Sequence, residues 1–178
     1  MSPSLRPCDH FRGSPGDTVT LILYGDYQCS HSCQTYKTIT NVLNQSPHPV
    51  CLVYRHFPRT PPQTSAWKAA EAAEAASAQG KFWEMHDLLY QHSEMLEDDK
   101  LVECAVQVGL DIPQFLKGLT NHIHTEQVEA DIESGRSQAI TAPPTILTRI
   151  YWQRTSALEP LLSKVLEIVE LTRPDDSS

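Results

Sequence analysis

Four residues with reactive or hydrogen-bonding side chains follow one another closely in the chain: Cys29, His31, Ser32 and Cys33. Cys29 falls between an apolar run and the first turn of a predicted helix, where unpaired backbone N–H groups favour an anion. We therefore expect the Cys29 thiol to lose its proton readily, because His31 can add positive charge or a hydrogen bond nearby. The alternative is an inert, buried cysteine.

Short apolar strands and amphipathic helices alternate around this position. Residues 19–24 and 50–57 are β-rich and apolar, as in strands buried on both faces, and a third run covers residues 145–152. Helical spacing or composition predicts helices over residues 30–43, 65–79, 81–91, 98–108, 112–119, 125–137 and 158–171. The order predicts an α/β fold, with a block of helices between the second and third strands.

Composition and charge exclude several classes of protein. The 178 residues carry 14 Lys and Arg against 22 Asp and Glu, a formal net charge of -8, which disfavours binding to nucleic acid or to an anionic membrane. No run of 18 apolar residues and no secretory signal is seen, so a cytoplasmic protein is expected. The five cysteines are an odd, scattered set and do not predict a disulfide framework.

Several separate segments resemble one known family. Residues 24–32 read YGDYQCSHS, and further matches follow in the same order: YRHFP at 54–58, AAEAAEAA at 69–76, QGKFWEMH at 79–86 and PPT at 143–145. Together they resemble the DsbA-like thioredoxin-fold oxidoreductases, in particular the bacterial subgroup that reads GDYQCPYC or GDYQCPHC. The resemblance implies thiol–disulfide exchange with protein or small-molecule thiols and disulfides.

The resemblance also implies a domain organisation and a substrate groove. It implies a thioredoxin-like core with an α-helical insertion: an arm over 1–15, the core over 16–62 and 139–173, and the insertion over 63–138. It implies a cis Pro144 beside Cys29, and substrate contacts from Tyr27, Ser30, Pro143 and Pro144. Pro143 has no N–H to donate, so we expect altered pairing with an extended substrate.

The chain departs from the family at the second cysteine of the C-x-x-C motif, where it has Ser32, with Cys33 one position later. In one interpretation Cys29 works as a monothiol, and glutathione or another thiol resolves its mixed disulfide. In a second, Cys33 is a shifted resolving thiol. Side chains at i and i+4 lie about 5–6 Å apart, whereas a disulfide needs Cβ atoms about 3.5–4.5 Å apart. In a third, the fold persists as a catalytically degenerate binding module.

A glutathione-dependent enzyme is a further alternative. Kappa-class glutathione transferases and their isomerase relatives resemble this fold and carry serine at the start of the same helix, a role open here to Ser30 or Ser32. Because Cys29 is retained, thiol–disulfide oxidoreductase activity is the first hypothesis. It requires no prosthetic group, and glutathione is a possible cosubstrate. His122 and His124 lack the spacing of a zinc site, so no metal is expected.

The remaining polar candidates have simpler interpretations. Asp26 is expected to cap the turn before Cys29, or else to accept its proton. Arg55 and His56 are expected at a solvated strand end, and Glu71 and Glu74 on a solvated helix face. Core positions are expected for Phe82, Trp83, Met85, Cys51 and Cys104.

Overall fold

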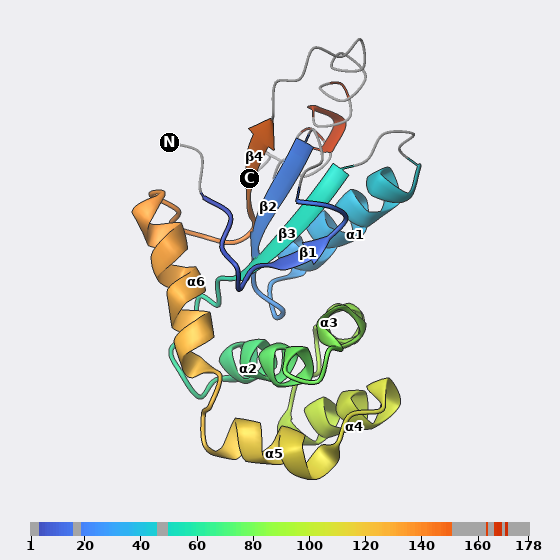
Figure 1. The fold of residues 1–178 in the computed structure, drawn as a ribbon, viewed down its shortest axis with the longest axis vertical. Helices are drawn as coiled ribbons and strands as arrows, with labels where there is room; N and C mark the ends of the chain where they lie inside the picture. The colour runs from blue at the N-terminus through green and yellow to red at the C-terminus, as the bar shows by residue number, and fades with distance from the viewer. Residues whose placement is uncertain are drawn as a thin grey trace. The chain divides into compact units, whose positions relative to one another are not determined.

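The computed structural model describes residues 4–15, 19–45, 50–150, 163, 166–168 and 170. Its strands form one four-stranded sheet. The strand order is β1-β3-β2-β4 (Figure 1). The strands are β1 (His10–Arg12), β2 (Val19–Gly25), β3 (Val50–His56) and β4 (Thr145–Ile150). Strand β1 runs antiparallel to β3, with Phe11 opposite Val53.

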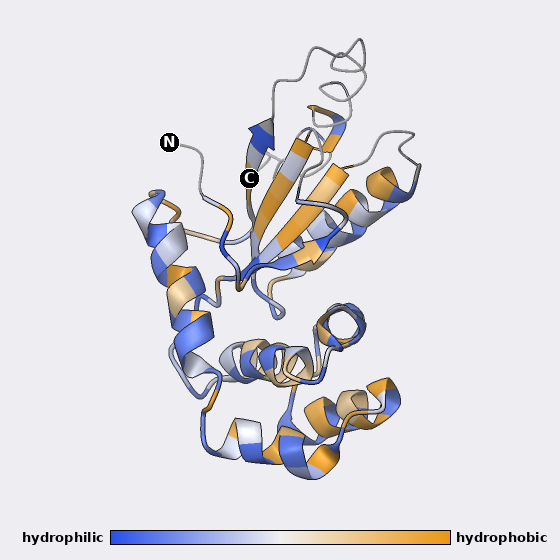
Figure 2. Cartoon of the chain, viewed as in Figure 1, coloured by the Kyte–Doolittle hydropathy of each residue, from blue (hydrophilic) through white to orange (hydrophobic). Residues whose placement is uncertain are grey.

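The central strands are as apolar as the sequence predicts. Every residue of β2 is buried, as is every residue of β3 after Val50, and Figure 2 shows apolar residues dominating both strands. Helix α1 (Ser30–Gln45) buries Tyr36, Ile39 and Val42, the predicted stripe. The two predicted central strands and the first helix are therefore confirmed.

The structure adds one strand near the N-terminus, and it describes only part of the elements predicted near the C-terminus. The predicted N-terminal arm contains β1, whose three residues are too short to show an alternating pattern. The last two residues of the predicted strand 145–152 lie outside the described residues. Of the predicted helix 158–171, residues 163, 166–168 and 170 are helical and the others lie outside the description.

The chain divides into two compact units. The first contains Met1–Leu23, Gln34–Tyr54 and Ile146–Ser178, and the second contains Tyr24–Cys33 and Arg55–Thr145. The turn that carries Cys29 therefore groups with the helices and with the Pro143–Pro144 segment. The predicted limits of the insertion, 63–138, remain a prediction.

Helix α2 (Ser65–Ser77) is the centre of the second unit. It contacts α3 (Phe82–Gln91), α4 (Asp98–Val108), α5 (Ile112–Thr120) and α6 (Thr125–Ser137), which surround it in Figure 1. Its many alanines allow these helices to approach closely, because their side chains are small. Gly80 follows α2 with φ +72°, a conformation that favours glycine.

The prediction of a solvated face on α2 is wrong. Glu71 is 1% exposed and Glu74 is 6% exposed, since helices pack around most of the circumference of α2. The prediction of core positions for Phe82 and Met85 is confirmed, while Trp83 is only half-buried.

None of the helices in the described residues is both long and apolar enough to cross a membrane.

Candidate active site

The turn between β2 and α1 is organised by the carboxylate of Asp26. Its Oδ1 accepts the backbone N–H of Gln28 at 2.9 Å, and its Oδ2 accepts the backbone N–H of Arg59 at 3.1 Å. Asp26 is 5% exposed, so these bonds compensate for the burial of its charge. This is the arrangement expected of a residue that caps the turn.

Cys29 occupies the position immediately before the first residue of α1. Its backbone N–H donates to the carbonyl of Asp26 at 3.1 Å, and its own carbonyl accepts the N–H of Cys33 at 3.0 Å. Cys29 therefore occupies the N-cap position of α1, next to the turn of a helix whose backbone N–H groups have no intrahelical partner. The thiol is free and partly exposed.

A distant segment of the chain meets this thiol. The peptide bond between Pro143 and Pro144 is cis, and the thiol of Cys29 lies 3.9 Å from the carbonyl oxygen of Pro143. Pro143 is buried and Pro144 partly exposed. The fold thus brings together the cysteine and the proline pair that the resemblance placed side by side.

Ser32 and Cys33 point into the interior. The Oγ of Ser32, which is fully buried, accepts the N–H of Asp26 at 3.3 Å. The thiol of Cys33 is also buried and donates to the carbonyl of Tyr90 on α3 at 3.3 Å. The two side chains therefore hold the turn in place in this structure, and the two thiols are not joined.

An open groove lies in front of the Cys29 thiol. It has a volume of about 590 Å³ and is lined by Asp26, Gln28, Cys29, Ser30, His31, Arg59, Thr60 and Ala66. Four predicted site residues, Asp26, Cys29, Ser30 and His31, thus share one groove, whereas the other predicted site residues do not line it. Arg59 and Thr60 also line the groove but are not predicted from the sequence. The one indication in the sequence is that they follow Pro58, just after the end of β3.

Tyr27, predicted to touch substrate, lies in the interior instead. It is 1% exposed, its hydroxyl is hydrogen-bonded to Nδ1 of His86 at 2.8 Å, and its ring packs 4.9 Å from that of Tyr90. Because Cys33 also bonds to Tyr90, helix α3 anchors the active-site turn on both sides of Cys29.

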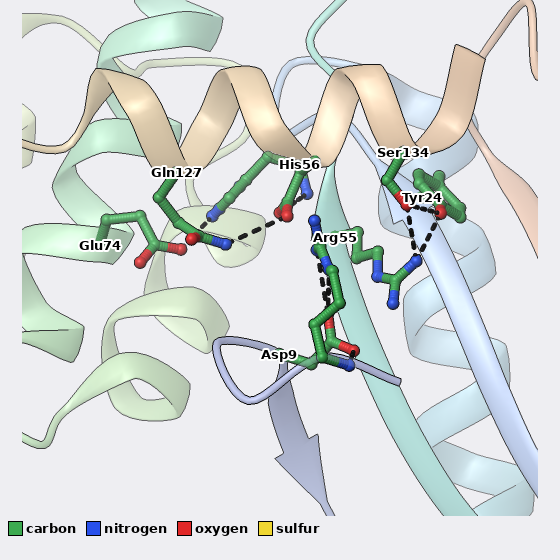
Figure 3. A network of polar contacts seen from close by, with 9 residues as sticks. Asp9, Tyr24, Arg55, His56, Glu74, Gln127 and Ser134 are labelled. Atoms are coloured by element: carbon green, nitrogen blue, oxygen red, sulfur yellow. Dashed lines mark hydrogen bonds and ion pairs between the residues drawn. The ribbon is translucent and has the colours of Figure 1, made fainter. Parts of the chain in front are cut away.

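The end of β3 is buried, so the prediction of a solvated terminus for Arg55 and His56 is wrong; each is 1% exposed. Figure 3 shows Nη1 of Arg55 donating to the hydroxyls of Tyr24 at 2.7 Å and Ser134 at 2.8 Å. These two hydroxyls are themselves 2.9 Å apart. Ser134 belongs to helix α6, so this contact could not be predicted from the residues next to Arg55 in the sequence.

His56 is bonded to polar groups from two helices, α2 and α6. Its Nε2 lies 2.9 Å from Oε1 of Glu74 on α2, and its backbone N–H donates to Asp131 on α6 at 2.8 Å (Figure 3). The other oxygen of Asp131 accepts from Gln127 at 3.1 Å. This buried polar cluster links β3 to α2 and α6.

Other predicted residues lie away from the groove. Cys51 and Cys104 are buried, as predicted, and burial raises the pKa of the Cys104 thiol above its ordinary value of 9.0. His122 pairs with the buried carboxylate of Glu71 at 3.2 Å.

Comparison with protein families and curated proteins gives consistent matches. A family model described as Thioredoxin matches residues 6–150. The Na(+)/H(+) antiporter NhaA 3 of Salinispora tropica is 34% identical over 137 residues, which are 77% of this chain and 21% of that protein. The Na(+)/H(+) antiporter NhaA 1 of Mycolicibacterium gilvum is 35% identical over 148 residues, 80% of this chain and 24% of that protein. The chain thus spans about a fifth to a quarter of these relatives' length.

Solved structures share the fold at lower identity. A thioredoxin-like oxidoreductase from Silicibacter pomeroyi DSS-3 has a TM-score of 0.70 at 23% identity, covering 93% of this chain and 94% of that one. BdbD from Bacillus subtilis (oxidised) has a TM-score of 0.73 at 19% identity, covering 94% and 96%. Alpha-DsbA1 from Wolbachia pipientis has a TM-score of 0.74 at 14% identity, covering 94% of each chain. These similarities show a DsbA-like thioredoxin fold.

Proposed function

Since the chain belongs to the thioredoxin family, we propose that it is a thiol–disulfide oxidoreductase that works through the single thiol of Cys29. The observation that carries the proposal is the environment of this thiol. It is free and partly exposed at the N-cap of α1, it faces an open groove, and the carbonyl of Pro143 lies 3.9 Å away. An N-cap thiol beside unpaired amides is a favourable place for the nucleophilic thiolate.

The monothiol form of the proposal is supported by the orientation of Cys33. Its thiol is buried and donates to the carbonyl of Tyr90, so pairing with Cys29 would require loss of that bond and distortion of the first turn of α1. In our proposal, Cys29 attacks a disulfide and retains one half as a mixed disulfide. An external thiol, with glutathione as a candidate, then releases it. The substrates are protein or small-molecule disulfides.

The proposed setting is the cytoplasm, because a monothiol cycle needs a pool of reduced thiols to release the mixed disulfide. The kappa-like alternative is less well supported. Ser32 is fully buried with its Oγ bonded to the turn, so only Ser30, which is exposed in the groove, could contact a bound thiolate.

Site-resolved alkylation tests whether Cys29 is a reactive thiol. Iodoacetamide is applied at pH 7 and the labelling of each cysteine is followed by peptide mass. Cys8, exposed in the N-terminal segment, is the matched internal control. We expect Cys29 to react about tenfold faster than Cys8, since nucleophilic thiolate is enriched at the helix N-terminus. Equal rates would support the degenerate binding module instead.

Paired serine variants test the monothiol mechanism. Cys29→Ser should abolish mixed-disulfide formation and turnover with a small disulfide, whereas Cys33→Ser should retain turnover within about threefold, because Cys33 acts in packing. Turnover is measured with an added reducing thiol and disulfides are mapped by mass. A Cys29–Cys33 disulfide after mild oxidation, with turnover lost in Cys33→Ser, would replace the monothiol mechanism by a shifted dithiol one.

A further inference from the structure

The groove in front of Cys29 presents a basic side chain in an acidic protein. The chain carries a formal net charge of -8 with histidine counted as neutral, and the groove is lined by Arg59, by His31 and by one acidic side chain, Asp26. The carboxylate of Asp26 is buried, and each of its oxygens accepts a backbone N–H. The carboxylate is therefore held by bonds within the turn, while His31 and Arg59 are exposed to solvent.

The position of Arg59 is fixed relative to the nucleophile. Its backbone N–H is bonded to the same carboxylate of Asp26 that holds the N–H of Gln28, the residue before Cys29. One buried carboxylate therefore holds the backbone of Arg59 and the backbone of the residue before Cys29. The exposed guanidinium of Arg59 is therefore available to a ligand that enters the groove.

The proline pair beside Cys29 limits recognition of a peptide through main-chain hydrogen bonds. A peptide that adds to a strand edge is held by main-chain hydrogen bonds. Pro143 and Pro144 both lack an N–H, so this segment donates no such bond at two consecutive residues. Its carbonyl at Pro143 lies beside the thiol of Cys29. Beside the thiol, these two residues therefore offer a peptide no main-chain N–H, which leaves the charge of the groove as a means of recognition.

From these observations, and on the basis of the function proposed above, we infer that the groove selects anionic low-molecular-weight disulfides, with Arg59 as the specificity-determining residue. The thiolate of Cys29 attacks one sulfur of R–S–S–R. The bond from Cys29 to that sulfur forms, the original S–S bond breaks, and R–S⁻ leaves with the electron pair. A second anionic thiolate then attacks the R sulfur of the mixed disulfide, which forms a new small disulfide and returns Cys29 as thiolate.

The experiment compares three small disulfides on a Cys8→Ser background, which removes the exposed control thiol. The probes are glutathione disulfide, which is anionic, bis(2-hydroxyethyl) disulfide, which is uncharged, and cystamine, which is cationic. The rate of mixed-disulfide formation at Cys29 is followed by intact mass at low salt. Each rate is divided by the rate of the same probe with 2-mercaptoethanol, to remove intrinsic reactivity.

We expect the normalised rate for glutathione disulfide to exceed that for cystamine by about tenfold, and the difference to shrink at high salt. Arg59→Glu should lower the rate with glutathione disulfide about tenfold, raise the rate with cystamine, and leave the uncharged probe within about twofold. Lys117→Glu makes the same change in net charge at an exposed residue outside the groove, and should change no rate by more than about twofold.

The outcomes separate this inference from the proposed function. If Cys29 reacts with all three probes at similar normalised rates, or if Arg59→Glu and Lys117→Glu have equal effects, anion selection is overturned while the oxidoreductase proposal stands. If Cys29 forms a mixed disulfide with none of the probes, the oxidoreductase proposal itself fails.

Discussion

The groove and the interior of the same compact unit contain the same types of residue in opposite environments. Cys29, His31 and Arg59 line the groove and are partly or fully exposed. Cys104, His56 and Arg55 are each 1% exposed. In the interior, Arg55 and His56 are bonded to partners on other elements and stabilise the fold, and Cys104 is buried on α4. The groove residues face solvent, where they are available to a substrate. Residue type alone therefore does not indicate which role a side chain has.

The largest expected effect comes from the histidine pair. His56→Ala should lower the free energy of unfolding by about 3–5 kcal/mol, because it removes a buried ring that is hydrogen-bonded to Glu74 at 2.9 Å and packs against the rings of Tyr27 and Phe82. His31→Ala should change it by less than about 0.5 kcal/mol, since His31 is exposed. Urea unfolding of both variants measures the difference, and equal losses would remove the contrast between the two environments.

The arginine pair should show a smaller contrast. Arg55→Met removes two charge-assisted hydrogen bonds, to Tyr24 and Ser134, and should cost about 2 kcal/mol, since those hydroxyls still bond to each other. Arg59→Met should cost less than about 0.5 kcal/mol. The same unfolding measurement applies. A loss at Arg59 as large as that at Arg55 would mean that Arg59 is structural.

Packing between α6 and the end of β3 can be tested at a glycine. A Cβ on Gly135 would lie 2.6 Å from Cε2 of Phe57, so Gly135→Ala should cost about 1–2 kcal/mol despite the better helix propensity of alanine. Gly118→Ala on α5 is the control. Its nearest neighbour, Nε2 of His124, is 3.1 Å away on a movable side chain, so the change should be close to neutral. A Gly135→Ala protein with unchanged thermal stability would show that Phe57 moves freely.

The smallest expected effect is the pH dependence due to Cys104. Burial raises the pKa of this thiol in the folded protein, so the unfolded chain releases the proton first as the pH rises past the ordinary value of 9.0. The contribution of this thiol to stability is thus complete below pH 9 and is lost as the pH rises through the folded pKa. Cys104→Ala should flatten the decline in the free energy of unfolding between pH 8 and 10.5. If the free energy of unfolding falls with pH as steeply in Cys104→Ala as in the unmodified protein, the decline is not due to Cys104.

Local sequence signals predicted the elements well. The apolar runs gave β2 and β3, the helical spacing gave α1 and α3–α6 within a few residues, and Gly80 follows α2 as expected. Asp26 was expected to cap its turn, and its contacts with two backbone amides are of that kind. These features depend on residues close together in sequence, so the sequence contains the information that determines them.

Contacts between distant segments could not be predicted in the same way. Arg55, His56, Glu71 and Glu74 were expected in solvent, since charged residues at a strand end or on a helix are usually exposed. Their burial depends on α2 being surrounded by other helices and on α6 bringing Ser134 and Asp131 to the end of β3. Arg59 was missed as a groove residue for the same reason.

The sequence by itself determined the thioredoxin-type elements, the placement of Cys29 at the start of a helix, and the absence of a cysteine at position 32. Only the tertiary structure decided that Cys33 faces Tyr90, that Ser32 is fully buried, and that Arg59 lines the groove. The physical reason is the separation in sequence of the residues that interact. Helix caps and strand patterns arise from neighbouring residues, whereas the burial and hydrogen-bond partners of a side chain depend on segments up to 114 residues away.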